Sequence, residues 1–164
     1  MRETEPVRLD RTDHEILKAL CEDGRLSDVA LAERINLSST AVSRRRKILE
    51  DRGVIAGYSA RPDLAVMGYG VLAMVSIELS SQAEVKLEEF ERAVMRCPSV
   101  SFCGFVSGGT DFQVMIHVRS FEDYDTVYRQ ELCNLPHVSK IKTSFVIREV
   151  SRVTVPRVIF TPGT

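Results

Sequence analysis

The stretch from Ser38 to Leu49, SSTAVSRRRKIL, contains three consecutive hydroxyl residues, four consecutive cations and no acidic residue. Val42 and Leu49 lie seven residues apart, so they fall on the same face of an α-helix. A serine at position 38 suits the residue before the first helical turn, and Gly53 suits the end of the helix. The stretch therefore predicts a helix over about 39–52 with one apolar face and one basic, hydroxyl-bearing face.

Two further helices are expected before it. Asp10 or Thr12 can cap a helix that ends near residues 22–24, and Ser27 can cap a second helix with apolar residues at helical spacing. Only the short break 36–38 separates that second helix from the basic one. Two short helices joined by a tight turn form a helix-turn-helix, whose second helix enters the major groove of DNA.

The polar face of the basic helix carries the candidate DNA contacts. Short hydroxyls let the backbone approach the base edges, and Arg44 suits bidentate recognition of guanine. Arg45 and Lys47 are expected to neutralise phosphate, although Arg45 and Arg46 can also lie along the helix flank with their stems packed. A basic run alone is more often a solvated helix face, but the preceding helix and turn favour DNA binding. The candidate DNA-binding residues are Ser38, Ser39, Thr40, Ser43, Arg44, Arg45 and Lys47.

The composition is that of a folded protein: 164 residues, 44% of them apolar and 27% charged, with a net charge of −1. No apolar run approaches the roughly 20 residues that span a bilayer. The N-terminal residues lack the apolar stretch of a secretory signal, so the cytoplasm is the expected location. Four scattered cysteines without a C-x-x-C pair predict reduced thiols and no metal or cofactor.

The second half of the chain has the periodicity of strands alternating with helices. Residues 58–70 contain a proline and two glycines and are expected to form a linker, with a possible strand at 56–61. The expected strands are 71–79, 100–106, 112–118 and 141–150, the expected helices 84–95 and 121–132, and residues 153–159 extend the sheet or add to it. This β-α-β-β-α-β order predicts a ferredoxin-like fold with one open sheet face, which a second copy of the chain can cover.

The fold class is therefore α+β, in three parts. Residues 1–57 form a winged-type helix-turn-helix domain and residues 58–70 a linker. Residues 71–164 form a ferredoxin-like βαββαβ domain that can oligomerise through its open sheet face.

The glycine pair in VSGGTDFQ, residues 106–113, lies between two of these strands. A phosphate-binding loop would need a Lys-Ser/Thr pair and a following helix, whereas residues 112–116 have the pattern of a strand. Asp111, Cys103, Cys133 and His117 fall into no catalytic motif, and a histidine on an apolar strand more often belongs to a core or an interface. We therefore expect a tight hairpin turn here, no catalytic residues and no enzymatic activity.

The ordered residues of both halves resemble the Lrp/AsnC family of leucine-responsive, or feast/famine, regulators. The resemblance covers about residues 9–155. In the first half it is carried by Leu9-Asp10, Asp13, Ile16-Leu17, Asp23-Gly24-Arg25, Leu31-Ala32, Leu37-Ser38, Val42, Arg45, Leu49-Glu50, Gly53-Val54-Ile55 and Gly57-Tyr58. In the second half it is carried by Val106-Ser107-Gly108, Asp111, Leu135-Pro136, Val138 and Thr143.

The resemblance implies a transcriptional regulator that binds double-stranded DNA as a dimer and assembles further into tetramers or octamers. It also implies a small-molecule effector, commonly an amino acid, bound between sensing domains. The effector-binding candidates are Gly108, Gly109, Thr110 and Asp111, with Thr143 or Ser144 completing the pocket. Gly109 replaces an acid of the family pattern and Thr110 an aromatic residue, so the effector's identity stays open.

Two questions remain open from the sequence. One is whether the second domain senses an effector at all, because a domain that only oligomerises would have the same fold pattern. The other is the role of His137, which stands where the family pattern has glycine. An exposed loop histidine is the simpler interpretation of that residue, and a pH or ligand role is the alternative.

Overall fold

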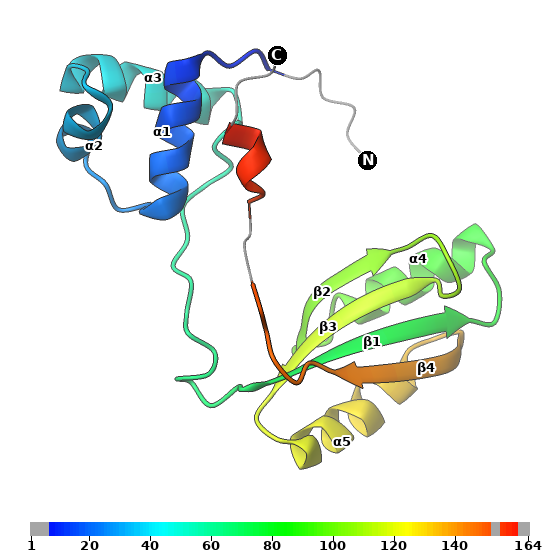
Figure 1. Cartoon of the computed structure of the whole chain (residues 1–164). Coiled ribbons are helices and arrows are strands. Elements are labelled where there is room, and N and C mark those ends of the chain that lie inside the picture. Colours follow the sequence, from blue (N-terminus) through cyan, green and yellow to red (C-terminus); the bar gives the residue numbers. More distant parts are fainter. Residues whose placement is uncertain (1–6, 152–154, 161–164) are drawn as a thin grey trace. The chain divides into compact units, whose positions relative to one another are not determined.

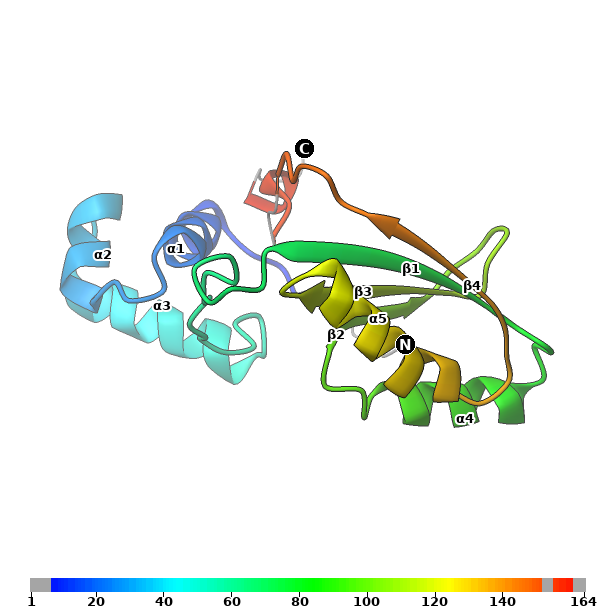
Figure 2. The same cartoon turned by 90° about the horizontal axis from the view of Figure 1, so that it is seen from below.

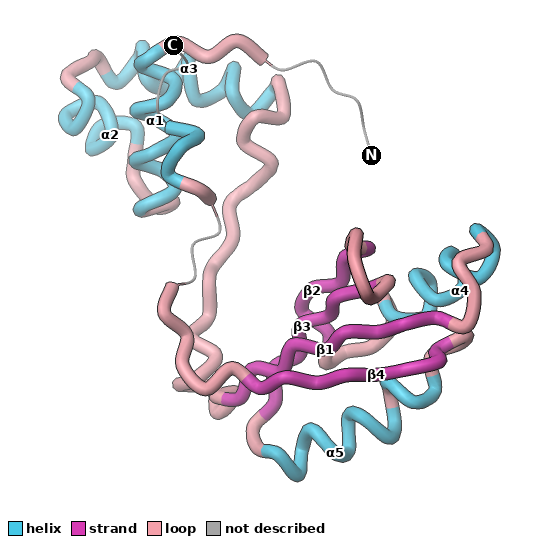
Figure 3. Tube along the Cα trace, turned by 45° about the vertical axis from the view of Figure 1, so that its right-hand side comes forward, coloured by secondary structure: helices cyan, strands magenta, loops and turns pink. Residues whose placement is uncertain are grey.

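The fold was obtained as a computed structural model that describes residues 7–151 and 155–160. These residues divide into two compact units. One contains the described residues up to Arg61 together with those from Ser151 onward, and the other contains Pro62–Val150. Helices make up the first unit, and a four-stranded sheet with two helices makes up the second (Figures 1 and 3). No helix within the described ranges is long and apolar enough to cross a membrane.

The helical unit has three helices, each with the side-chain cap that its sequence predicts. Asp10 begins α1 (Arg11–Glu22) and forms a reciprocal capping box with Asp13. Ser27 caps α2 (Asp28–Ile35) by accepting a hydrogen bond from the Ala30 amide. Ser38 caps α3 (Ser39–Asp51) in the same way through the Ala41 amide, with a separation of 3.2 Å. The predicted caps at Ser27 and Ser38 are thus confirmed, and Asp10 rather than Thr12 caps the first helix.

A small apolar core holds the three helices together. Ile16, Leu31, Val42 and Leu49 are fully buried or nearly so, and they come from all three helices. Gly53 ends α3 with a positive φ of 69°, a backbone conformation that glycine adopts without steric cost. The Val54 amide then donates back to the Leu49 carbonyl at 2.9 Å, which closes the helix end.

The second unit contains one antiparallel sheet in the order β2-β3-β1-β4. The strands are β1 (Val71–Leu79), β2 (Val100–Phe105), β3 (Phe112–Val118) and β4 (Val138–Phe145), and the helices are α4 (Glu84–Val94) and α5 (Phe121–Gln130). The ferredoxin-like order predicted from the sequence is confirmed. Both helices cover the same face of the sheet, as Figure 2 shows.

The core of this unit lies between the helices and that face. Alternate residues of β1 and β3 are buried there, and the rings of Phe90 and Phe112 pack with centroids 4.4 Å apart. The opposite, open face mixes polar and apolar side chains. On it Ser76 donates to Gln113 at 3.0 Å, while Phe102 and Met74 are 48% and 36% exposed.

Several predicted boundaries differ from the structure. The predicted strand 141–150 begins earlier, at Val138, and ends earlier, at Phe145. It ends there because its antiparallel partner β1 begins at Val71, and the last bond between them runs from the Val146 amide to the Leu72 carbonyl. No strand forms at 56–61. Residues 157–160 form the 3₁₀ helix η2 (Arg157–Phe160) of the helical unit instead of extending the sheet, and residues 153–154 lie outside the described ranges.

The predicted linker 58–70 is only partly irregular. The division between the two units falls inside it, between Arg61 and Pro62. The Asp63 carboxylate accepts hydrogen bonds from the amides of Ala65 and Val66, and so organises a turn before the sheet. Side-chain capping of a turn explains this order in a segment that has no helical or strand periodicity.

Asp111 attaches the β2–β3 hairpin to the end of β1. Its side chain is buried, and the carboxylate accepts hydrogen bonds from the Leu79 amide at 2.7 Å and from the Gln82 side chain at 2.6 Å. The Asp111 amide and the Thr110 hydroxyl both donate to the Ile77 carbonyl. The conformation of the hairpin therefore depends on β1 and on the connection from β1 to α4.

His137 connects the turn before β4 to helix α4. Its backbone is left-handed, with φ 63°, which accounts for the glycine that the family pattern has at this position. The ring nitrogen Nε2 lies 2.5 Å from the Glu89 carboxylate, and the His137 carbonyl accepts from the Ser80 amide. The hydrogen bond between the His137 ring and the Glu89 carboxylate holds the pKa of Glu89 below its ordinary value of 4.5. His137 is thus a paired residue rather than a free loop side chain.

Replacing Asp111 should destabilise the sheet unit. Asp111→Ala leaves the Leu79 amide without its acceptor, and such a loss costs about 1–3 kcal/mol. Thermal and urea denaturation measure the effect. The matched control is Asp125→Ala, which breaks an exposed pair with Arg129 on α5 and should cost less than about 0.5 kcal/mol. Equal effects of the two substitutions would contradict the supporting role of Asp111.

The Glu89–His137 pair predicts a pH-dependent difference in stability. A carboxyl group whose pKa is lowered by folding stabilises the folded state above its unfolded pKa, and this stabilisation is lost as pH falls through the folded pKa. Glu89→Gln should therefore be less stable than the wild type at about pH 5.5, with the difference shrinking toward pH 3. Urea denaturation at each pH measures it, and Glu88→Gln on the same helix is the control. A difference that grows on acidification would refute the pairing.

Candidate nucleic-acid interface and effector loop

Helix α3 presents most of the predicted DNA-binding residues to solvent. Ser38, Ser39, Thr40, Ser43, Arg44 and Lys47 are all exposed, while Val42 and Leu49 are buried on the opposite side. The separation follows from the helical period of the stretch, which directs its apolar residues toward α1 and α2. The exposed surface formed by Ser38, Ser39, Thr40, Ser43, Arg44 and Lys47 is called the α3 polar face below.

Arg45 differs from the other predicted members of the set. Its guanidinium donates through Nη1 to Asp10 at 2.7 Å and to Asp13 at 2.8 Å, and the side chain is only 29% exposed. The Asp13 amide, and then Arg45, hold the pKa of Asp10 below its ordinary value. The same two carboxylates raise the pKa of Arg45. These bonds join the middle of α3 to the start of α1.

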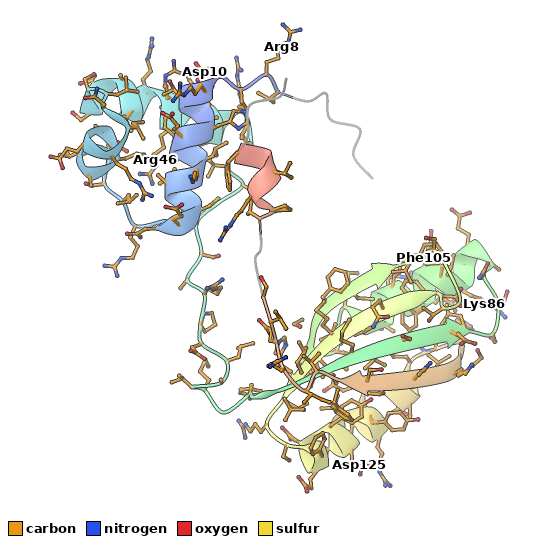
Figure 4. The ribbon with its side chains drawn as sticks, viewed as in Figure 1. Arg8, Asp10, Arg46, Lys86, Phe105 and Asp125 are labelled. Carbon is orange, nitrogen blue, oxygen red and sulfur yellow. The ribbon has the colours of Figure 1, made fainter. Side chains whose placement is uncertain are left out.

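Arg46 points in a different direction from Arg45 and is also engaged. It pairs with Asp28 at 3.2 Å and Glu50 at 3.3 Å, and its guanidinium lies over the Tyr58 ring, 4.8 Å from the centroid. The Tyr58 hydroxyl in turn donates to Glu50 at 2.8 Å. Figure 4 shows Asp10 at the start of α1, with Arg46 directed into the helical unit. The packed alternative for Arg46 therefore matches the structure.

The four consecutive cations thus divide into two classes. Arg45 and Arg46 are half-buried and ion-paired, whereas Arg44 and Lys47 are exposed and pair with no residue in the described part of the chain. Two uncommitted positive charges next to four hydroxyls form a surface suited to phosphate and to base edges. The sequence did not predict that Asp10 and Asp13 bind Arg45 or that Tyr58 packs on Arg46, because no local pattern indicates which arginine each of them contacts.

The β2–β3 hairpin leaves room around its two glycines. A methyl group added at Gly108 or Gly109 would meet no atom within 4 Å, although Gly108 has a φ of 132° that other residues rarely adopt. The amides of Gly108, Gly109 and Thr110 donate no hydrogen bond to any described residue. Phe105, labelled in Figure 4, is 59% exposed at the end of β2 beside this loop.

The structure separates the remaining effector candidates. Thr143 lies on the helix-covered face of β4, with its hydroxyl 2.5 Å from that of Tyr124, and Ser144 lies on the open face. Successive side chains of a strand point to opposite faces, so Thr143 and Ser144 of one chain cannot line the same site. Asp111 is buried beneath the hairpin with both carboxylate oxygens bonded. Gly108, Gly109 and Thr110 are the accessible candidates.

The residues considered for catalysis are dispersed. Burial raises the pKa of the Cys103 thiol to about 11, which opposes the thiolate that nucleophilic chemistry requires. His117 lies 3.0 Å from the Ser101 hydroxyl on the open face of the sheet. Within the described ranges no three histidine, cysteine, aspartate or glutamate side chains gather as metal ligands would.

Comparison with protein families assigns both halves of the chain. Residues 9–56 match the winged helix-turn-helix DNA-binding model, and residues 72–156 match the Lrp/AsnC ligand binding domain. The Bkd operon transcriptional regulator of Pseudomonas aeruginosa is 34% identical over 150 residues, which are 92% of this chain and 98% of that protein. The leucine-responsive regulatory protein of Rhizobium meliloti is 33% identical over 88% of this chain and 92% of its own length.

Solved structures agree with these matches. A transcriptional regulator from Neisseria meningitidis in complex with L-Met has a TM-score of 0.86 and 31% identity, and the match covers 91% of this chain and 97% of that one. An AsnC family transcriptional regulator from Agrobacterium tumefaciens has a TM-score of 0.87 and 27% identity, over 93% and 99% of the two chains. The chain therefore belongs to the Lrp/AsnC family, as a DNA-binding transcriptional regulator with an Lrp/AsnC ligand-binding domain and not as an enzyme.

Proposed function

We propose that this regulator works in the cytoplasm as a dimer that places two α3 helices in successive major grooves of a two-fold-symmetric site. An amino acid or a related metabolite bound at the β2–β3 hairpin then changes the assembly or its DNA affinity. The observation that supports DNA recognition most directly is the α3 polar face, where Arg44 and Lys47 are exposed and unpaired among the described residues. Half-sites about one helical turn apart suit two such helices.

The roles within α3 follow from exposure and pairing. Arg44, near the start of the helix, is proposed to read a base together with Ser39, Thr40 and Ser43. Lys47 is proposed to neutralise phosphate. Arg45, which the sequence pattern also assigned to phosphate, is proposed to act mainly by holding α3 against Asp10 and Asp13. An ion pair that sets the angle of a recognition helix affects binding without touching DNA.

The open face of the sheet supports the proposed dimer. Both helices cover the other face, and the open face carries exposed Phe102 and Met74 beside polar side chains. An apolar patch of this kind on one sheet face is commonly covered by another protein surface, and a second copy gives a symmetric interface. Assembly beyond a dimer, into tetramers or octamers, is also part of the proposal.

The effector proposal depends on the amides of the hairpin. An amino-acid carboxylate needs hydrogen-bond donors, and the amides of Gly108, Gly109 and Thr110 are uncommitted within the described chain. Phe105 provides an exposed apolar surface beside them. Asp111 is proposed as a positioning residue, because its carboxylate fixes the loop to β1. The related regulator solved with L-Met supports an amino acid as the class of ligand.

The DNA-binding proposal predicts distinct effects for the two free cations. Lys47→Ala should weaken binding to all sequences and reduce the slope of log affinity against log salt by roughly one. Arg44→Ala should in addition relax sequence preference, because a bidentate contact to guanine contributes about 1–3 kcal/mol of discrimination. Fluorescence anisotropy titrations with a selected site and with random DNA, over a range of salt concentrations, measure both effects.

Further variants make this test decisive. Arg129→Ala removes an exposed arginine of α5 and should leave DNA affinity unchanged. Arg45→Ala should lower the thermal stability of the helical unit together with DNA affinity, and Asp13→Ala should do the same. Unchanged DNA affinity in a triple alanine variant of Arg44, Arg45 and Lys47 would contradict the assignment of α3 as the DNA-recognition helix. If Arg45→Ala reduces the slope of log affinity against log salt but leaves the thermal stability of the helical unit unchanged, Arg45 instead contacts phosphate.

The effector proposal predicts a ligand-dependent rise in melting temperature. A ligand that binds only the folded state stabilises it by about 2.7 kcal/mol at a concentration one hundred times its Kd. We expect at least one of the twenty amino acids to raise the melting temperature or to change the oligomer size measured by light scattering. Gly109→Val fills the open space at the loop and should abolish this response while keeping the fold.

Gly70→Val is the matched control, since a side chain there also meets no atom within 4 Å. It should retain the response. If the whole amino-acid panel leaves melting temperature, assembly and DNA affinity of the wild type unchanged, the result contradicts an amino-acid effector and favours a domain that only oligomerises. A response that survives in Gly109→Val would move the site away from the hairpin.

A further inference from the structure

The C-terminal end of helix α4 carries two arginines four residues apart, Arg92 and Arg96. Residues at this spacing are neighbours on a helix surface, and like charges there repel each other. Both side chains are exposed, and neither forms an ion pair with a residue that the structure describes. Two adjacent positive charges without a counter-charge from the described chain can be neutralised by an external anion.

A cavity of about 670 Å³ lies beside these two arginines. It lies between α4 and the segment that joins α5 to β4, and its lining residues are Glu89, Arg92, Ala93, Arg96, Asn134 and Pro136. Ala93 and Pro136 are half-buried and contribute apolar surface. Sites for small molecules commonly have volumes of about 300–1,000 Å³. The cavity shares no residue with the β2–β3 hairpin, so it is separate from the effector site proposed there.

The backbone of α4 holds Arg92 in place. Its Nε donates to the Glu88 carbonyl at 3.2 Å, so the two terminal nitrogens of the guanidinium are left without a partner among the described residues. A guanidinium matches the oxygens of a phosphate or a carboxylate with paired N–H groups. A carboxylate has one charge to share between two arginines, whereas a phosphate monoester carries nearly two charges and three free oxygens. The arginine pair therefore favours a phosphate.

The cavity also contains hydrogen-bond acceptors. Asn134 donates through Nδ2 to the carbonyls of Arg129 and Gln130, at 3.2 and 2.8 Å, so its Oδ1 is left as an acceptor. Glu89 binds His137 through Oε2, and its Oε1 accepts from no described residue. A fully ionised inorganic anion has no hydrogen to donate to these oxygens. A ligand that also carries hydroxyl groups does.

We propose that this cavity is a second small-molecule site, which binds a phosphate ester carrying hydroxyl groups, such as a sugar or polyol phosphate. Arg92 and Arg96 bind the phosphate, and the oxygens of Asn134 and Glu89 accept from the hydroxyls. Glu89 and Arg96 are seven residues apart, about 10 Å along the helix axis, so the charged and the hydroxyl-bearing parts of the ligand have separate places. Such a ligand connects α4 to the turn before β4, next to the Glu89–His137 bond.

Calorimetric titration of the full chain with glycerol 3-phosphate, at an ionic strength held constant with chloride, tests the site. We expect saturable binding of one molecule per chain. Arg92→Gln and Arg96→Gln should each weaken it by roughly tenfold or more, because each removes charged hydrogen bonds to the phosphate. The matched control is Lys86→Gln, which removes the same charge from α4 (labelled in Figure 4) outside the cavity lining. Its affinity should stay within about twofold of the wild type, because salt screens exposed charges.

Inorganic phosphate and succinate distinguish the kinds of anion. The wild type should bind glycerol 3-phosphate more tightly than either of them. Asn134→Ala should weaken glycerol 3-phosphate and leave inorganic phosphate unchanged, since only the ester has hydroxyls for Asn134 to accept from. Tighter binding of succinate, or equal losses for the ester and inorganic phosphate in Asn134→Ala, would overturn the assignment to a hydroxylated phosphate ester.

The other proposed anion-binding surfaces are tested in the same titration. Gly109→Val at the hairpin and the Arg44→Ala, Lys47→Ala double variant of α3 should bind glycerol 3-phosphate as the wild type does, whatever their response to amino acids or DNA. Loss of binding in either would place the anion there and overturn the site on α4. Equal affinity in the wild type and both α4 arginine variants would overturn it as well. A lower melting temperature of those variants with unchanged affinity would assign the arginines to helix stability alone.

Discussion

Hydrogen-bonded ion pairs connect Arg45 of helix α3 to the two aspartates at the start of α1. Arg45 and Asp13 are half-buried, and the main importance of these pairs is geometric. The two carboxylates are already organised by their own capping box, with separations of 3.1 and 2.8 Å. The guanidinium therefore meets a preformed acceptor, and its ion pairs act together with the buried Val42 and Leu49, which direct one face of α3 toward α1 and α2.

This packing decides which cations face outward. With Arg45 directed to α1 and Arg46 directed to Asp28 and Tyr58, positions 44 and 47 are left on the solvent side, together with the hydroxyls of the first helical turns. A composition-based view of four adjacent cations would give all of them the same role. In the folded unit Arg45 and Arg46 pair with acidic residues of the same unit, and only Arg44 and Lys47 are available to a polyanion.

The sheet unit uses a similar arrangement at the β2–β3 hairpin. One buried carboxylate, that of Asp111, accepts from the backbone of Leu79 and from Gln82. The glycines that follow β2 are thereby left open with their amides unused. The Asp111 carboxylate holds the hairpin in place, and the amides of residues 108–110 donate to no described residue. Such a loop can bind a small anion without first changing its conformation. The buried acid is therefore better understood as part of the scaffold than as part of the surface.

Much of the fold was predictable from local patterns, because caps and periodicity are local. Ser27, Ser38 and Gly53 mark helix ends, and alternating apolar residues mark β1 and β3. The partners of Arg45 were not predictable, since Asp10 and Asp13 lie more than thirty residues away in sequence. Thr143 and Ser144 point to opposite faces of the sheet. Which face each one takes depends on the strand register, which pairs Thr143 with Val75 and Ser144 with Met74. The position of η2 depends on a contact between distant segments, for which no local pattern exists.

The return of the chain to α1 has a practical consequence for handling the protein. A fusion partner or affinity tag placed after Phe160 would be attached to the helix-turn-helix unit, although the preceding strand belongs to the ligand-binding domain. A fragment consisting of the first 61 residues would have an α1 whose outer face has lost its covering segment. Domain boundaries drawn from chain order alone would therefore cut through a folded unit, and the segment to retain is the one at the far end of the sequence.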